Sequence, residues 1–271
     1  MAKSGDPERA ATKVDPDFRV WDGVYGTFAE APAAGPGFAG PIWRDRSLAA
    51  ARDTLAAAQM GQPLDYALRQ RNAVLPPVTA LTLAGQQRAN ILDFGGGLGT
   101  GYLVLDKAMS DTVARIDYTI VEGEGICRAG RDLFAGANNQ PSFRSELPAS
   151  ARFDIVHAAS VIQYIEDWRH LIRKLAGYGA PLLSLADIFI GEFSTYVTLQ
   201  NYYDSRIRHW FFNAAEFIGE VERNGYQLAM RAECDGMILG QYGPLPMANF
   251  TPVLRLAHTS NLLFRKPSAR R

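Results

Sequence analysis

Short apolar runs alternate with amphipathic stretches through the middle of the chain. The apolar runs predict buried strands at residues 91–94, 117–121, 142–145, 153–159 and 181–186. Apolar positions three or four residues apart predict the intervening helices at 102–109, 125–135 and 168–177. Strands that alternate with helices of this length predict a parallel sheet with helices on both faces.

The N-terminal part of the chain has a different pattern. Residues 1–20 alternate in charge and contain two prolines, which predicts a mobile tail. Residues 21–88 are expected to form an accessory segment. Large aromatic side chains within 21–45 indicate that this stretch packs against the rest of the protein, and the spacing of apolar residues over 46–85 predicts helices.

The last third of the chain combines two expected inserts with a short helix and two strands. Residues 191–212 are expected to be an irregular, aromatic insert. Asn213 and Glu216 have the spacing of a capping box and predict a helix that reaches Arg223. We expect strands at 226–234 and 254–266, a second insert at 235–253 between them, and a tail at 267–271.

Composition narrows the range of partners. Of 271 residues, 28 are Lys or Arg and 28 are Asp or Glu, so the charges balance and favour neither nucleic acid nor an anionic membrane. The two cysteines indicate neither a disulfide framework nor a zinc site, and no pair of histidines has metal-ligand spacing. No run approaches the ~20 apolar residues of a membrane span. We therefore expect a cytoplasmic protein without a metal.

The most informative stretch is residues 93–101, which read Asp-Phe-Gly-Gly-Gly-Leu-Gly-Thr-Gly. Glycines between a strand and a helix let the backbone approach a ligand closely, and they aim free helix N–H groups at it. The dinucleotide fingerprint, with glycines at i, i+2 and i+5, fails in every frame. The pattern Asp-x-Gly-x-Gly-x-Gly fits instead, and its acid suits a cofactor with a cationic amino-acid end. The simpler interpretation is a tight structural turn.

A second acid follows the next predicted strand. Glu122 comes directly after residues 117–121, and a carboxylate at that point can accept hydrogen bonds from both hydroxyls of a ribose. Each such charge-assisted bond contributes roughly 1.5–3 kcal/mol. A solvated strand end is the structural alternative for Glu122.

These residues resemble the cofactor site of class I S-adenosylmethionine (SAM) methyltransferases. The resemblance covers about residues 89–266. It includes the residues that follow the strand at 153–159, and the helix and two strands predicted within 213–266. Residues near 21–31, with Gln163, Gln200 and Trp210, are similar to a bacterial group of methyltransferase-like proteins whose substrate is not established. The resemblance implies a Rossmann-like, doubly wound, mostly parallel seven-stranded sheet with an antiparallel C-terminal strand pair, preceded by a mainly helical accessory segment.

The resemblance also implies roles for individual residues. Those expected to bind SAM are Asp93, Gly95, Gly96, Gly97, Gly99, Glu122, Glu146, Ser160 and Tyr25. Those expected to contact the substrate are Tyr164, Tyr203, Arg206 and Trp210. His209 is the candidate general base, whereas His157, within an apolar strand, is more simply a core histidine. The aromatic cluster over 196–212 is either a substrate wall or a packed lid or dimer contact.

The function implied is methyl transfer from SAM to a small or medium organic acceptor by a monomer or homodimer. Two alternatives remain. One is a non-catalytic SAM-binding or scaffold protein, because a fold does not fix a function. The other is a nicotinamide-dependent oxidoreductase, which the failed fingerprint disfavours.

Overall fold

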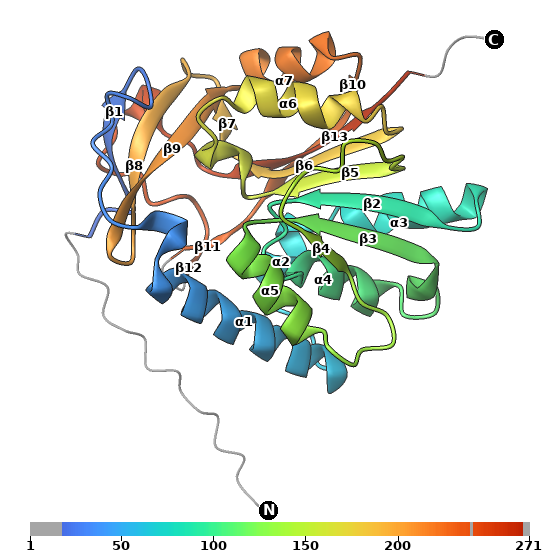
Figure 1. Cartoon of the computed structure of the whole chain (residues 1–271). Helices are drawn as coiled ribbons and strands as arrows, with labels where there is room; N and C mark the ends of the chain where they lie inside the picture. The colour runs from blue at the N-terminus through green and yellow to red at the C-terminus, as the bar shows by residue number, and fades with distance from the viewer. Residues whose placement is uncertain (1–17, 239–240, 268–271) are drawn as a thin grey trace, which may run out of the picture.

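The computed structural model describes residues 18–238 and 241–267. Most of the tails predicted at 1–20 and 267–271 therefore lies outside the described residues. Two sheets and seven helices account for most of the described chain (Figure 1).

The larger sheet has seven strands in the order β10-β13-β6-β5-β2-β3-β4. Their bounds are β2 (Ala89–Phe94), β3 (Ile116–Val121), β4 (Ser142–Arg144), β5 (Ile155–Ala159), β6 (Leu182–Ile188), β10 (Gln227–Cys234) and β13 (Thr259–Arg265). Neighbouring strands from β4 to β6 are parallel, and β13 runs antiparallel to both β6 and β10. The predicted fold class is confirmed.

The helices fall on both faces of this sheet. Their bounds are α1 (Pro41–Gln59), α2 (Tyr66–Arg71), α3 (Leu75–Gly85), α4 (Thr100–Ala108), α5 (Glu124–Leu133), α6 (Trp168–Gly177) and α7 (Ala214–Arg223). Figure 1 shows α6 and α7 above the strands and α1, α4 and α5 below them. None of the helices in the described ranges is both long and apolar enough to span a bilayer.

Alternation along the strands divides the core into two layers. On β2, Leu92 joins the cluster under α6 and α7, whereas its neighbour Ile91 joins the cluster under α3, α4 and α5. Both side chains are fully buried. Because successive side chains of a strand point to opposite faces, a short apolar run without polar interruptions is what a doubly covered strand requires. The same reasoning applies to β5 and β6, whose residues are mostly buried on both faces.

The segment 191–212 contradicts the prediction of an irregular insert. It forms β8 (Tyr196–Tyr202) and β9 (Ser205–Asn213), an antiparallel hairpin in a second sheet ordered β1-β8-β9-β7. The other members are β1 (Trp21–Tyr25) and the short β7 (Ile190–Gly191). The first four residues of β8 are all buried, so the strand shows no alternation that a sequence pattern could reveal.

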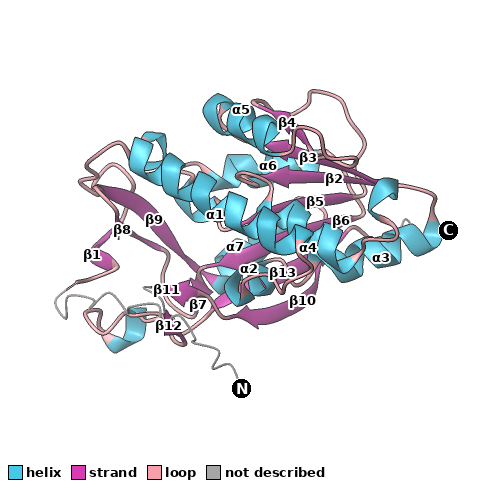
Figure 2. Cartoon of the chain, turned by 90° about the horizontal axis from the view of Figure 1, so that it is seen from below, coloured by secondary structure: helices cyan, strands magenta, loops and turns pink. Residues whose placement is uncertain are grey.

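The N-terminal accessory segment is partly β and partly helical. Strand β1 pairs with β8, so its Trp21 lies opposite Gln200 some 180 positions later in the sequence. The predicted helices appear as α1, α2 and α3, and Figure 2 shows α1 lying across α4. Residues 60–65, which include Gly61 and Pro63, separate α1 from α2.

The C-terminal elements follow the prediction with one shift. The Asn213 side chain caps α7 by accepting a hydrogen bond from the Glu216 N–H at 2.9 Å. The last strand begins at Thr259 rather than at 254, because residues 252–254 form a 3-10 turn, η4 (Pro252–Leu254). The described part of 235–253 also contains two-residue strands, β11 (Met237–Ile238) and β12 (Gln241–Tyr242).

Two leucines of α3 test the assigned core. Leu75 is 0% exposed and Leu81 is 73% exposed. We expect Leu75→Ala to lower the free energy of unfolding by about 2–5 kcal/mol, because it removes buried methyl groups and leaves a cavity. Leu81→Ala, the same change on the solvent face of the same helix, should cost less than about 0.5 kcal/mol. Urea denaturation measures both, and equal losses would contradict the placement of α3.

Candidate active site

The glycine stretch leaves β2 where the order of the sheet reverses. Strand β2 is flanked by β3 on one side and by β5 on the other, and ligands of open parallel sheets bind at such a switch point, beyond the carboxyl ends of the strands. Gly95, Gly97 and Gly99 have φ values of +73°, +56° and +83°. This left-handed backbone favours glycine and turns the chain directly into α4.

The glycines also differ in what surrounds them. A Cβ added to Gly95 would lie 2.5 Å from Val161, and one added to Gly96 would lie 2.2 Å from a carboxylate oxygen of Asp93. A Cβ on Gly97 would meet nothing within 4 Å. Gly95 and Gly96 are therefore needed for the turn itself, whereas the backbone at Gly97 faces open space that a ligand could fill.

Asp93 is buried beneath this turn. Its Oδ2 accepts a hydrogen bond from the Tyr118 hydroxyl at 2.7 Å, and its Oδ1 is buried without a protein partner. Burial raises the pKa of Asp93 to about 7, the Tyr118 hydrogen bond opposes that rise, and the nearby charge of Glu122 adds to it. A buried, unpartnered carboxylate oxygen at neutral pH fits the cationic amino-acid end of the expected cofactor.

Glu122 connects the end of β3 to the glycine turn. Its Oε1 accepts a hydrogen bond from the Gly97 N–H at 3.2 Å, and its Oε2 accepts one from the Gly123 N–H at 2.9 Å. The half-buried carboxylate thus lies beside the open face of Gly97. The structure brings together Asp93, the glycines and Glu122, the residues predicted to bind the cofactor from adjacent strands.

The loop after β5 forms the opposite side of the turn. Val161 packs against Gly95, and the preceding Ser160 has a φ of +56°. The Ser160 hydroxyl donates to the carboxylate of Asp187, which itself has a φ of +54° near the end of β6. Left-handed non-glycine residues are strained, and strain of this kind gathers at functional sites. Sequence reasoning missed Asp187, although it ends a buried strand just as Asp93 does.

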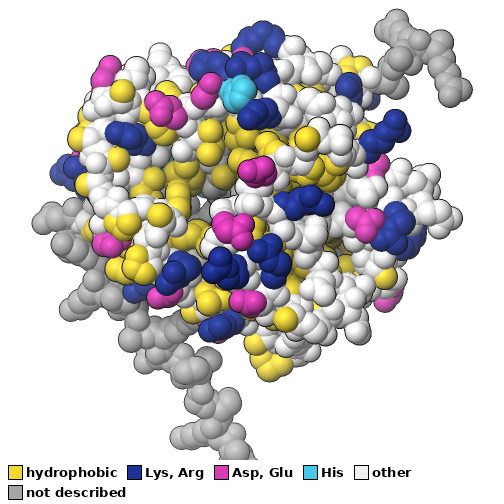
Figure 3. Space-filling model, in the orientation of Figure 1, with side chains coloured by type: hydrophobic (Ala, Val, Ile, Leu, Met, Phe, Trp, Pro, Cys, Tyr) yellow, Lys and Arg dark blue, Asp and Glu magenta, His cyan; other side chains and the backbone are white. Residues whose placement is uncertain are grey.

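Two side-chain contacts join the loop after β5 to the second sheet. The Tyr164 hydroxyl, from η3 (Ile162–Tyr164), donates to Gln200 Oε1 at 2.8 Å, and the Trp210 indole N–H donates to the Ile165 carbonyl at 3.1 Å. The second sheet therefore stands beside the carboxyl ends of the parallel strands. Figure 3 shows hydrophobic side chains in the hollow between these parts, with charged side chains along its edge.

The other predicted substrate residues lie along the β8–β9 hairpin. Tyr203, in its turn, is half exposed, and the Arg46 guanidinium lies 5.1 Å from its ring centre. Arg206 pairs with Asp22 at 3.3 Å, so its charge already has a partner. Their roles toward a substrate stay predictions.

His209 lies inside an aromatic cluster. It is fully buried against Phe189, Tyr164 and Trp21, with ring centres 4.4, 5.1 and 5.9 Å away, and neither ring nitrogen has a hydrogen-bond partner. Burial lowers the pKa of His209 to about 3. A neutral imidazole with so low a pKa is a weak base at physiological pH, so its placement does not favour the predicted general-base role.

His157 occupies the core of the main sheet. Its Nδ1 lies 3.1 Å from the Ser184 hydroxyl, and burial lowers the pKa of His157 to about 4. This environment agrees with the interpretation as a core histidine.

Glu146 and Tyr25 are predicted cofactor residues for which we find no contact with the glycine turn among the described residues. Glu146 is exposed on the loop after β4, at the same edge of the sheet as Glu122 because the two strands are parallel. Tyr25 packs with Phe28 and Val197 in a small cluster of the second sheet. Contact of either residue with a cofactor stays a prediction.

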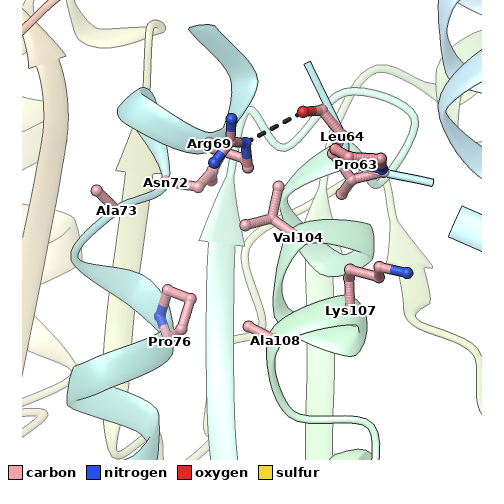
Figure 4. A pocket seen from close by; sticks show the side chains of 9 residues that line it. All are labelled: Pro63, Leu64, Arg69, Asn72, Ala73, Pro76, Val104, Lys107 and Ala108. Atoms are coloured by element: carbon pink, nitrogen blue, oxygen red, sulfur yellow. Dashed lines mark hydrogen bonds between the residues drawn. The ribbon is translucent and has the colours of Figure 1, made fainter. Parts of the chain in front are cut away.

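A cavity of about 380 Å³ lies between α4 and the segment that carries α2 and α3 (Figure 4). Its lining residues are Pro63, Leu64, Arg69, Asn72, Ala73, Pro76, Val104, Lys107 and Ala108. None of them belongs to the glycine turn, so this cavity is separate from the predicted cofactor site. Within 18–238 and 241–267, no three His, Cys, Asp or Glu side chains gather as metal ligands would.

Comparison with known proteins adds a family and a set of similar folds. Residues 66–229, more than half of the chain, match a protein family described as methyltransferase domain. Among curated proteins, no sequence matches the chain.

Similar folds occur among solved structures. One is the 1,6-didemethyltoxoflavin-N1-methyltransferase of Burkholderia thailandensis, with 1,6-didemethyltoxoflavin and S-adenosylhomocysteine bound. It is 16% identical, with a TM-score of 0.52, over 88% of this chain and 93% of that one. A SAM-dependent methyltransferase from Clostridium acetobutylicum gives a TM-score of 0.50 at 10% identity, over 83% of this chain and 99% of that one. A SAM-dependent methyltransferase from Methanosarcina mazei gives a TM-score of 0.51 at 12% identity, over 69% of this chain and 96% of that one. At these identities the likeness establishes the fold.

The raised pKa of Asp93 predicts a pH-dependent stability. Because the folded-state pKa of about 7 exceeds the ordinary value of 3.8, Asp93 adds stability below about pH 4 that is lost as pH rises through 7. Relative to Asp93→Asn, the free energy of unfolding of the wild-type protein should fall between pH 5 and pH 8. The fall should be at most about 1.4 kcal/mol for each pH unit. The contributions of the buried histidines cancel in this difference. Urea denaturation at several pH values measures it, and parallel curves would contradict the buried carboxylate.

Proposed function

The chain belongs to the methyltransferase-domain family, and we propose that it transfers the methyl group of S-adenosylmethionine to a small or medium organic acceptor. S-adenosylmethionine is the cofactor of this family, and the Burkholderia protein of the same fold binds its product S-adenosylhomocysteine. Family membership favours methyl transfer over the oxidoreductase and the scaffold protein that the sequence left open.

The observation that carries the proposal is the contact between Glu122 and the glycine turn. Carboxylate oxygens of Glu122 and the open backbone of Gly97 face the same space beyond β2 and β3. We assign the ribose hydroxyls to Glu122, because a carboxylate accepts two such donors with full charge assistance. The amino-acid end is assigned to Asp93, whose Oδ1 has no partner within the protein.

The residues present suit a displacement at carbon. SAM supplies a methyl group on a positively charged sulfur, which is already an activated leaving group. The chain's contribution is therefore alignment of the acceptor, and proximity alone can supply roughly 7–11 kcal/mol of the barrier. The hydrogen bond between Tyr164 and Gln200 and the packing of Val161 on Gly95 hold the loop after β5 beside the turn. We place the acceptor between this loop and the second sheet, near Tyr164 and Trp210.

An acceptor that must lose a proton needs a base at this place. His209 is fully buried, with its pKa lowered to about 3, and is therefore poorly suited to that step. Asp187 is partly exposed near the end of β6, and its carboxylate accepts hydrogen bonds from Ser160 and Thr259. We propose Asp187 as the better-placed acceptor of such a proton.

Removal of the Glu122 carboxylate tests the cofactor site. We expect Glu122→Gln to weaken SAM binding about 10- to 100-fold, because each charge-assisted hydrogen bond contributes roughly 1.5–3 kcal/mol. Isothermal titration calorimetry with SAM measures the change. Glu124→Gln is the matched control, since Glu124 is an exposed acid two residues later that pairs with Arg131. Unchanged binding by Glu122→Gln, or no binding by the wild-type protein, would refute the proposed function.

Substitution of Gly97 tests the open face of the turn. Gly97→Ala places a methyl group where the cofactor should lie, and we expect SAM binding to fall at least about tenfold, or about 1.4 kcal/mol. Gly225→Ala is the control, because Gly225 also has a positive φ (+87°) and open space around it but follows α7. Both variants should lose about 1–2 kcal/mol of stability from left-handed strain. Equal SAM affinities for the two variants would contradict the assigned face.

A further inference from the structure

One half-buried cation beside the proposed acceptor space has no ion-pair or hydrogen-bond partner among the residues that the structure describes. Arg71 is the last residue of α2, and its side chain is neither exposed nor fully buried. Across 18–238 and 241–267, no ion pair or side-chain hydrogen bond involves its guanidinium. A guanidinium carries five N–H donors and is always charged, so its removal from water without a partner is unfavourable. A group in this state is expected to be satisfied by a ligand.

The helix that carries Arg71 is fixed at both ends. At its start, Asp65 Oδ1 accepts a hydrogen bond from the Leu68 N–H at 3.0 Å. At its end, the Asn261 side-chain amide donates to the Gln70 carbonyl at 2.8 Å, while its oxygen accepts from the Asp187 N–H at 2.9 Å. One amide thus ties the last turn of α2 to the end of β6. Arg71 is held beside the strand that carries Asp187.

Side chains from three other elements lie within electrostatic reach of Arg71. Burial raises the pKa of Tyr202 to about 12 and that of Cys234 to about 12, and the positive charge of Arg71 opposes both shifts. The pKa of Tyr164, also raised by burial, is opposed by the same charge. These residues come from β8, β10 and η3, so the charge of Arg71 acts on all three elements.

Aromatic rings surround the same place. The Phe38 ring, from η1 (Gly37–Ala39), lies edge-on to Tyr164 at 4.8 Å and to Tyr202 at 6.0 Å between ring centres. The Tyr202 ring lies 4.6 Å from that of Tyr203. The hollow between the two sheets is therefore walled by aromatic faces and edges, which suit a flat apolar body.

The acids nearby limit the negative charge that a ligand can carry. The Asp187 carboxylate accepts from the Ser160 and Thr259 hydroxyls, the latter at 2.6 Å, and makes no ion pair with Arg71 within 4.0 Å. Its negative charge raises the pKa of Tyr164 and of Cys234, the groups on which Arg71 also acts. The charge of Asp235, which pairs with His258, also raises the pKa of Cys234. One cation near these two acids favours a ligand with a single negative charge over a dianionic phosphate.

We propose that Arg71 binds a carboxylate of the methyl acceptor, which is a small aromatic carboxylic acid. A planar guanidinium matches the two oxygens of a carboxylate with parallel hydrogen bonds, and the ring of the acid lies among Phe38, Tyr164 and Tyr202. The inference rests on the proposed function, because it assigns the acceptor of that same site. The assignment accounts for a half-buried guanidinium that has no partner in the described part of the chain.

Binding of benzoate to the protein saturated with S-adenosylhomocysteine tests the proposal. We expect the wild-type protein to bind benzoate, observed by calorimetry or saturation-transfer NMR, and Arg71→Gln to bind it at least tenfold more weakly. Arg71→Lys keeps the charge but loses the paired donors, so its affinity should lie between the two. Arg69→Gln is the matched control, two residues earlier on the same helix, and should bind as the wild-type protein does. The neutral analogue benzamide should not distinguish wild type from Arg71→Gln.

Several outcomes would overturn the assignment. They are no benzoate binding by the wild-type protein, equal affinities for wild type and Arg71→Gln, and an equal loss in Arg69→Gln. Tighter, Arg71-dependent binding of phenyl phosphate would replace the carboxylate with a phosphate. Thermal unfolding checks that the variants fold. If Arg71→Gln does not fold, the benzoate affinity of Arg71→Lys decides the question. The affinity for S-adenosylhomocysteine, measured separately, should be the same in every variant. If the wild-type protein does not bind S-adenosylhomocysteine, the proposed function is refuted instead.

Discussion

The turn that follows β2 is the constraint on which the rest of the site depends. The chain leaves a strand buried on both faces, passes the buried Asp93 and enters α4 within a few residues. Glycine adopts the left-handed backbone at three of those positions without the strain that other residues would incur. The Gly97 N–H is then held by Glu122 from the neighbouring strand. Because two strands and one helix meet through this contact, an acid, a free backbone edge and a helix N-terminus face one space.

The second sheet gives this space its other wall. Strand β1 comes from the first described residues and β8 from the last third of the chain, and their pairing places aromatic side chains opposite the carboxyl ends of the parallel strands. The hydrogen bonds of Tyr164 to Gln200 and of Trp210 to Ile165 join the two layers directly.

Charge is distributed unevenly around the site. Burial keeps His157 and His209 neutral at physiological pH and raises the pKa of Asp93 to about 7. Asp187 is held by hydroxyl donors, whereas Arg71 has no protein partner among the described residues. Polar groups that are satisfied within the protein stabilise the fold, and those left unsatisfied mark where a ligand completes the structure.

The sequence alone determined the parallel sheet and the glycine turn, because these features depend on local periodicity and on residues near one another along the chain. It also placed Asp93 and Glu122 at the carboxyl ends of two successive strands. The burial of His209 and the hairpin at 191–212 depended on tertiary structure, since β8 is covered on both faces and so carries no alternating pattern. Asp187 and Arg71 lie more than a hundred residues apart, and Asn261, which contacts both segments, is farther still. Only folding brings them together, because no short-range pattern encodes a contact between such distant segments.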